Sequence, residues 1–303
     1  MNKNIIKDVL SWEKFDDETS KETNFPPKKI DLFNRLMAST DNFFVIAAIG
    51  AFVPGYVMII SKKLIPSLAL IEDDQKNELD WLITTISGTI KKIYKKEMTI
   101  FEHGMCACIG GLDRAHLHLM PINKGLSDEI LIKCINKALI RRRAGISSVE
   151  FNDHKFENIH DITEIMNSSD KDLYKINGKQ LFYEDIKNLD VENWPFSTRP
   201  LVLKGGHYVL FKSSSPSISF LTNKNFQTQL GREIVFEVEK ESNPEMSKLN
   251  EKILNKNSYA NIWKWQEFSF KENIYSTMND LIDPLQDIYK KDNKFNFKVS
   301  LRR

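Results

Sequence analysis

The sequence predicts an α+β fold in which an antiparallel sheet is flanked by helices. Three stretches carry this prediction. The uncharged run at 43–60 is rich in β-branched and aromatic residues and is divided by Pro54-Gly55, which is typical of two buried strands. Residues 72–96 place apolar side chains at helical spacing, and residues 115–121 alternate polar and apolar side chains with the period of a strand.

The composition is that of an ordinary globular protein and favours no charged partner. Of the 303 residues, 41% are hydrophobic and 28% are charged, which is enough apolar content for one large or two modest domains. A net charge of +2 gives no strong attraction to nucleic acid or to a membrane surface, so we expect neither as a partner. Three cysteines make no disulfide framework and no signal peptide is seen, so we expect a cytoplasmic protein.

The run at 43–60 has a second interpretation, because it is long enough to cross a bilayer. Gly50 and Pro54-Gly55 interrupt it, and β-branched side chains are more typical of strands than of a membrane helix. We therefore predict two strands joined by a turn and no membrane span.

The other elements of the N-terminal half follow in order. Residues 1–40 are predicted to be a polar leader that ends in a short amphipathic turn. The helix over 72–96 carries lysines toward its C-terminal end, where the helix dipole favours positive charge. Strands are predicted at 98–101 and 115–121, and a helix over 127–143 begins at a serine suited to cap it.

The C-terminal half is predicted to contain paired strands followed by helices. The segments P-L-V-L-K-G-G-H-Y-V-L-F-K at 200–212 and S-I-S-F-L at 217–221 have the composition of strands. A helix is predicted to begin within 227–237, and 271–289 has helical spacing.

The residues that bear chemistry lie in the stretch 101–121. Arg114, His116 and His118 alternate with apolar residues, so on a strand they project from one face, about 7 Å apart. A neutral imidazole is a good nucleophile toward phosphorus and can leave again. A neighbouring imidazole or guanidinium can hold the phosphoryl oxygens as charge develops. The row therefore suits a phosphorylated substrate, and an ordinary strand with two partly exposed histidines is the alternative.

Glycines beside this row are expected to bring backbone N–H groups close to an anion. Gly104, Gly110 and Gly111 lack the side chain that would block such an approach. Zinc is the alternative ligand, because two histidines one residue apart on a strand can chelate it. Cys106 and Cys108 would have to reach around the glycine turn to complete that site, so we expect no metal.

The order of these elements resembles the histidine-triad (HIT) superfamily of nucleotide hydrolases and nucleotidyltransferases. The resemblance covers residues 40–125 and rests on the strand pair, the helix, the F-E-H-G strand and the A-H-L-H-L-M-P strand. F-E-H-G in particular resembles a group of bacterial and phage HIT-like proteins. The resemblance implies a HIT-like antiparallel sheet with flanking helices over 41–148 and a C-terminal α+β extension over 149–303 packed on that domain.

The resemblance also implies roles for individual residues. The family motif has three alternating histidines, and its middle one, the nucleophile, corresponds to His116. His118 would contact the phosphate or the leaving group. The first position is Arg114, which can bind phosphate but cannot exchange a proton near neutral pH. Glu102 falls where many members carry an amide near the phosphate, and Glu102 or His103 would support the leaving group.

The C-terminal extension is expected to contribute to substrate binding. Its order of motifs, beginning with G-x-Y-x-x-F, resembles the extension of the same HIT-like group. By that resemblance Tyr208, Gln229 and Arg232 would face the substrate. Packing and surface roles within the extension are the alternative for all three.

The resemblance implies a phosphohydrolase that acts on a phosphoester or phosphoanhydride of a nucleotide, or another small phosphorylated substrate, through a covalent His116 intermediate. It implies no cofactor and no metal. A nucleotidyltransferase of the adenylyl or uridylyl type, with a second acceptor, is one alternative, and a non-catalytic nucleotide- or phosphate-binding protein is the other. A homodimer through the long helix and its neighbouring strand is also implied, unless the extension covers that surface.

Overall fold

The computed structural model describes residues 35–48, 50–63, 65–104, 115–123, 149–151, 154–156, 174–176, 179–181, 194–204, 208–212, 218–222, 230–244, 246, 248, 270–292 and 294–299. For the strands within 149–181 and at 218–222, the description covers the backbone alone. The helix predicted over 127–143 lies outside the described residues.

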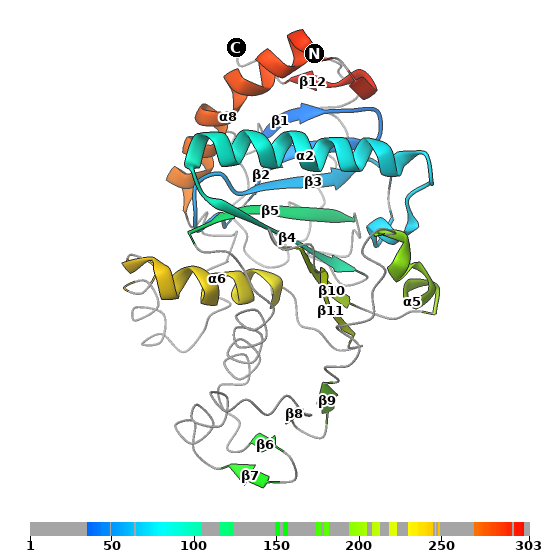
Figure 1. Ribbon diagram of the computed structural model, residues 1–303, viewed down its shortest axis with the longest axis vertical. Helices are drawn as coiled ribbons and strands as arrows, with labels where there is room; N and C mark the ends of the chain where they lie inside the picture. The colour runs from blue at the N-terminus through cyan, green and yellow to red at the C-terminus, as the bar shows by residue number, and fades with distance from the viewer. Residues whose placement is uncertain are drawn as a thin grey trace, which may run out of the picture.

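An eight-stranded antiparallel sheet, here called the main sheet, forms the centre of the fold (Figure 1). Its strands lie in the order β11-β10-β4-β5-β3-β2-β1-β12, and every neighbouring pair is antiparallel. This confirms the predicted α+β class with an antiparallel sheet. In chain order the strands are β1 (Leu36–Ser39), β2 (Phe43–Ala47), β3 (Val57–Ser61), β4 (Glu97–Gly104), β5 (His116–Ile122), β10 (Tyr208–Lys212), β11 (Ile218–Thr222) and β12 (Lys298–Val299).

β2 and β3 confirm the two strands predicted within 43–60. Every residue of both strands is buried, and the run lacks charge because both of its faces are covered. Between the strands the chain turns at Gly50 and Gly55, whose φ angles of 69° and 86° lie in the left-handed region that glycine adopts without strain. No helix in the described part of the chain is both long enough and apolar enough to cross a bilayer.

The pairing register assigns the side chains of β3, β4 and β5 to two faces. Phe101 of β4 lies opposite His118 of β5, so both project to the same side of the main sheet. Since side chains alternate along a strand, His116 and His103 project to that side as well. We call this side the histidine face. Leu117 and Glu102, which pair with one another, project from the opposite face.

α2 (Gln75–Tyr94) covers that opposite face and confirms the helix predicted over 72–96 (Figure 1). The helix ends at Tyr94, and the next residue, Lys95, caps it with a left-handed backbone. At this end Tyr94 and Pro121 approach Gly55 so closely that a Cβ there would lie 2.5 Å from the Tyr94 ring. The apolar stripe of α2 is buried against the sheet and includes Leu79, Leu82, Ile83, Ile86 and Ile90.

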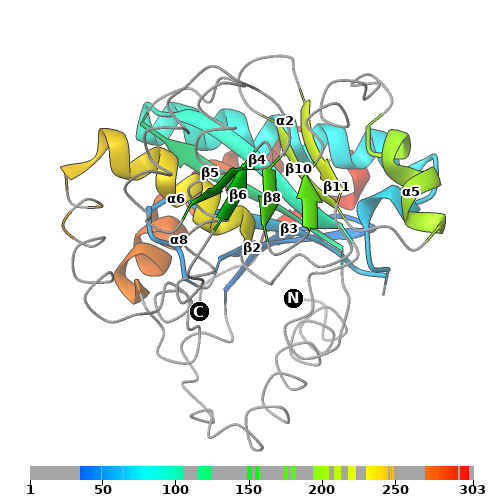
Figure 2. The ribbon, with the colours of Figure 1, turned by 90° about the horizontal axis from the view of Figure 1, so that it is seen from below.

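α6 (Leu230–Ser242) packs on the histidine face and confirms the helix predicted to begin within 227–237. The backbone N–H of Gly231 donates to Nε2 of His103 at 2.8 Å. Further along the helix, the ring of Phe236 meets Phe52 edge-on at 5.5 Å. Figure 2 shows α2 on one side of the main sheet and α6 on the other.

α8 (Lys271–Lys291) confirms the helix predicted over 271–289. It lies beside α2, where the Tyr94 hydroxyl donates to Asp280 at 2.9 Å. It also supports the turn between β2 and β3, because the N–H of Gly55 donates to Oγ1 of Thr277 at 2.8 Å. After α8 the chain returns to pair β12 with β1.

Two sequence-based expectations about elements are wrong. The leader was predicted to extend to residue 40, with an amphipathic turn at 30–37, but Leu36–Ser39 form β1 of the main sheet. Residues 200–203, predicted as a strand before a turn at Lys204-Gly205-Gly206, belong to the helix α5 (Arg199–Leu203), whereas the predicted strand after the turn is confirmed by β10. Pro200 explains the helix, because proline fits the first turn, where its missing N–H is not needed.

Strands from both halves of the chain share the main sheet. β10 pairs with β4 and β12 pairs with β1, so the predicted division at 148/149 does not separate two independent sheets. A second, four-stranded sheet, which was not predicted, has the order β7-β6-β8-β9. Its strands are β6 (Val149–Phe151), β7 (His154–Phe156), β8 (Tyr174–Ile176) and β9 (Lys179–Leu181).

Candidate functional site

The two histidines of β5 lie side by side on the histidine face, as the alternating pattern predicts. Their ring centroids are 4.8 Å apart and the ring planes meet at 73°. His116 is partly exposed, whereas His118 is buried with 4% of its surface accessible. β5 therefore presents one accessible imidazole beside one that is fixed in the interior.

His118 is held by an aromatic stack and by a hydrogen bond. Its ring stacks on Phe101 with centroids 4.2 Å apart and planes at 10°. Nδ1 of His118 lies 2.5 Å from the hydroxyl of Tyr56, the residue immediately before β3. Nε of Arg232, from the first turn of α6, donates to the same hydroxyl at 2.9 Å. A buried chain of polar contacts thus runs from Arg232 through Tyr56 to His118.

Electrostatics keep both His118 and Tyr56 neutral. Burial lowers the pKa of His118 well below its usual value, and electrostatic interaction with His116, Arg232 and His103 lowers it further. Burial also raises the pKa of Tyr56 to about 12, although the charge of Arg232 and its hydrogen bond act in the opposite direction. Near neutral pH the site therefore holds a neutral imidazole and a neutral phenol.

His103 occupies the neighbouring position on the histidine face, on β4. Its Nε2 accepts the hydrogen bond from Gly231, and its ring meets Phe101 edge-on at 6.3 Å. A Cβ on Gly231 would lie 2.5 Å from the Phe101 ring and 3.0 Å from Nε2 of His103. Only glycine therefore lets the start of α6 approach so closely and bring Arg232 to the site.

Glu102 lies on the opposite face, which corrects the expectation that it works beside the histidines. Its side chain is fully buried, and its carboxylate accepts from the N–H of Leu68 at 2.7 Å and from the hydroxyl of Tyr208 at 2.6 Å. Burial raises the pKa of Glu102 to about 7, although these hydrogen bonds lower it. The physical reason for its position is strand alternation, because Glu102 and His103 are adjacent on β4.

Tyr208 and Gly104 also belong to this opposite face. Besides donating to Glu102, the Tyr208 hydroxyl lies 2.6 Å from that of Ser67. Burial, followed by the charge of Glu102, raises the pKa of Tyr208 well above its usual value. A Cβ on Gly104 would lie 2.0 Å from the Tyr208 ring, so this glycine makes room for an aromatic ring. The structure therefore does not bring Tyr208 to the histidines, and it gives Gly104 a packing role.

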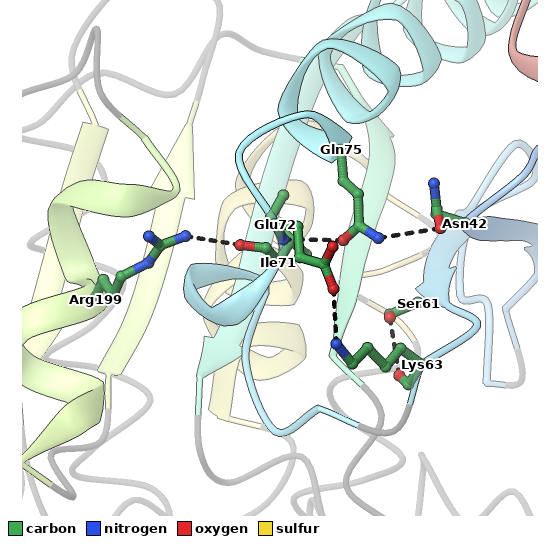
Figure 3. A network of polar contacts seen from close by, with 7 residues as sticks. All are labelled: Asn42, Ser61, Lys63, Ile71, Glu72, Gln75 and Arg199. Carbon is green, nitrogen blue, oxygen red and sulfur yellow. Dashed lines mark hydrogen bonds and ion pairs between the residues drawn. The ribbon is translucent and has the colours of Figure 1, made fainter.

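The loop between β3 and α2, which carries Ser67 and η2 (Leu68–Leu70), is fastened from both sides (Figure 3). Arg199, at the start of α5, donates through Nε to the carbonyl of Ala69 at 2.8 Å and through Nη2 to that of Ile71 at 2.7 Å. On the other side, the N–H of Glu72 donates to Oε1 of Gln75 at 3.0 Å, and the amide of Gln75 donates to Asn42 at 3.0 Å. These contacts hold the backbone N–H of Leu68 in place for Glu102.

The remaining predicted site residues lie outside the described residues: Arg114, Gly110, Gly111 and Gln229. The same holds for Cys106 and Cys108 of the zinc alternative. Within the described ranges, no three His, Cys, Asp or Glu side chains lie together in a way that could hold a metal ion.

Tyr56 is the site residue that sequence reasoning missed. It follows the Pro54-Gly55 turn and is separated from His118 by 62 residues. The one available signal was a tyrosine in an otherwise apolar run, because a buried phenol needs a polar partner. That signal does not say which residue the partner is.

Comparison with known proteins places the chain in no family. No protein-family model matches it, and no curated protein matches it either. The side chains gathered on the histidine face are therefore the basis for a function.

Proposed function

We propose that this protein is a HIT-like phosphohydrolase that acts on a phosphoester or phosphoanhydride of a nucleotide, with His116 as the nucleophile. The observation that carries the proposal is the pairing of a partly exposed His116 with a buried, neutral His118 on one face of β5. The nucleotide, as opposed to another phosphorylated molecule, is proposed from the resemblance of the strand and helix order to the HIT superfamily.

The reaction would proceed in two displacements at phosphorus. In the first, a ring nitrogen of His116 forms an N–P bond while the P–O bond to the leaving group breaks, and the leaving oxygen keeps the electron pair and takes a proton from solvent. In the second, water forms a new P–O bond, the N–P bond breaks, and a proton returns to solvent. The imidazole is neutral again at the end, and no further reactant is consumed.

His118 and Arg232 would stabilise the charge that builds on the nonbridging oxygens. His118 is buried and neutral, so it would act as a hydrogen-bond donor. Arg232 is buried behind Tyr56 and supplies a fixed positive charge on the same face. Arg114 would add a second guanidinium, as its position in the motif implies.

A trapping experiment tests the nucleophile. The full chain is incubated with a panel of α-³²P-labelled nucleoside triphosphates and dinucleotides, quenched in alkaline denaturant, and examined for protein-bound label that is released by acid. We expect label on the wild type and on the control Lys92→Ala, an exposed residue of α2 on the other face. We expect none on His116→Ala. Undiminished turnover by His116→Ala would defeat the assignment.

A nucleotidyltransferase is the second candidate, and the shared sheet favours it. β10, from the C-terminal half, pairs with β4 beside His103, so this half of the chain lies close to the histidine face and could carry an acceptor. Adding phosphate, sulfate or a sugar phosphate to the reaction and identifying the nucleotide product separates the two. An adduct between nucleotide and acceptor would select the transferase. Tight calorimetric binding with no product would select a binding protein instead.

A further inference from the structure

We propose that Tyr56 is a positioning residue that holds His118 in the tautomer protonated at Nε2, and that Arg232 sets the direction of the Tyr56 hydroxyl. This inference rests on the proposed function for its catalytic consequence. Its structural part concerns only the three side chains and can be tested without any substrate.

The donor and acceptor inventory of the three groups fixes the tautomer. A guanidinium can only donate, so the hydrogen bond from Nε of Arg232 occupies a lone pair of the Tyr56 oxygen. The single hydrogen of the phenol is then directed to the other neighbour, Nδ1 of His118, 2.5 Å away. A nitrogen that accepts this hydrogen carries none of its own. In the neutral ring the proton therefore lies on Nε2.

The surroundings of His118 favour the same state. The titratable and charged groups that face it are His116 on β5, His103 on β4, Tyr56 before β3 and Arg232 on α6. His116, Arg232 and His103 each oppose a positive charge on His118, and burial opposes it more strongly than any of them. His118 therefore remains neutral, and only the choice between its two tautomers is left for Tyr56 to decide.

Tyr56 is itself held in place through the backbone and through its ring. The preceding residue, Gly55, is bonded through its N–H to Thr277 of α8. The carbonyl of Tyr56 accepts from the N–H of Ala48 at 3.1 Å. The guanidinium of Arg232 lies 5.3 Å from the centre of the Tyr56 ring. A hydroxyl fixed in this way orients an imidazole reliably.

For catalysis, the fixed tautomer makes Nε2 of His118 a hydrogen-bond donor at all times. With its proton on Nε2, His118 presents an N–H to a phosphoryl oxygen, whereas the other tautomer would present a lone pair and repel it. The HIT motif has a histidine at its first position, where this chain has Arg114, which cannot exchange a proton near neutral pH. Tyr56 and Arg232 would supply the orientation that this histidine would otherwise give.

Nitrogen-15 NMR of the full chain labelled at histidine tests the tautomer. Long-range ¹H–¹⁵N spectra distinguish Nδ1–H, Nε2–H and the imidazolium, and the spectrum of His118→Gln assigns the resonances. We expect the wild-type ring to show the Nε2–H pattern near neutral pH. Tyr56→Phe, which removes only the hydroxyl, is expected to give a mixture of tautomers.

Tyr289→Phe is the matched control, because it removes the hydroxyl of a tyrosine on α8 that is 43% exposed and should leave the His118 pattern unchanged. A wild-type His118 protonated at Nδ1, or a Tyr56→Phe spectrum identical to that of the wild type, would overturn the proposal. Arg232→Met gives a second arm if Tyr56→Phe folds poorly, since freeing the hydroxyl should also mix the tautomers.

Measuring nucleotide turnover distinguishes a failure of the tautomer proposal from a failure of the proposed hydrolase function. Where the wild type turns over a nucleotide, Tyr56→Phe should lower kcat in proportion to the fraction of the Nε2–H tautomer that the spectrum shows to be lost, about two-fold for an even mixture, with little change in KM. Unchanged kcat would remove the catalytic consequence. An Nε2–H pattern in a protein that turns over no nucleotide would instead uphold the tautomer and defeat the hydrolase.

Discussion

The substitution Glu102→Gln tests whether the buried carboxyl of β4 makes the stability of the protein depend on pH. Burial raises the pKa of Glu102 from an ordinary 4.5 to about 7. Between these pH values the folded protein keeps a proton that the unfolded chain has released. The free energy of unfolding therefore falls as the pH rises through this window, and the contribution of Glu102 becomes level above pH 7.

The size of the effect follows from the two pKa values. Each pH unit within the window corresponds to about 1.4 kcal/mol, so ionisation of Glu102 costs the folded protein about 3 kcal/mol by pH 8. Glutamine keeps the shape of the side chain and can still accept from Leu68, but it must donate to the Tyr208 oxygen. This rearranged hydrogen bond costs about 1 kcal/mol at every pH. Glu102→Gln should thus be about 2 kcal/mol more stable than the wild type at pH 8 and within about 1 kcal/mol of it at pH 5.

The assay is urea unfolding followed by tryptophan fluorescence at pH 5, 6, 7 and 8. The difference between variant and wild type at each pH cancels the titration of all other groups. Glu72→Gln, at an exposed glutamate, controls for the loss of one carboxylate. If the difference between Glu102→Gln and the wild type stays constant from pH 5 to pH 8, Glu102 is already ionised in the folded protein and the reasoning is refuted.

Three further substitutions have defined outcomes. Gly104→Ala should destabilise the protein by about 1–3 kcal/mol, because the new methyl group would meet the Tyr208 ring at 2.0 Å. Gly88→Ala, on the exposed side of α2 with nothing within 4 Å of a Cβ, should stabilise it by up to about 1 kcal/mol. Thermal unfolding compares the two, and equal effects would contradict the packing argument. Arg199→Lys should speed amide hydrogen exchange across 65–73, measured by mass spectrometry, because an ammonium cannot replace the two-pronged contact with the loop carbonyls. Unchanged exchange would show that other contacts hold the loop.

Local pattern predicted most of the central elements correctly. The apolar run at 43–60, the helix over 72–96 and the alternation at 115–121 each depend on residues close in sequence, and the structure contains β2, β3, α2 and β5 there. The alternation also predicted that His116 and His118 share one face. These features follow from burial and strand geometry alone.

The wrong placement of Glu102 and the contacts that were not predicted have different physical causes. Strand alternation already implied that Glu102 and His103 cannot face the same substrate, so the placement of Glu102 was open to sequence reasoning. The contact of Tyr56 with His118 was not, because it joins distant segments through the sheet and is completed by Arg232 from α6. Likewise, the pairing of β12 with β1 leaves no trace in the local pattern of either strand.

The pairing of β10 with β4 limits where the chain can be divided into fragments that stay folded. β10 pairs with β4 over five residues, from Gly104 to Ile100. A fragment that stops at 148 would leave one side of β4 with unsatisfied N–H and C=O groups, and such an open edge recruits other copies. We expect that fragment to precipitate when produced alone. Co-expression with 149–303 as a separate chain should rescue it, since the second piece carries the strand that closes the edge.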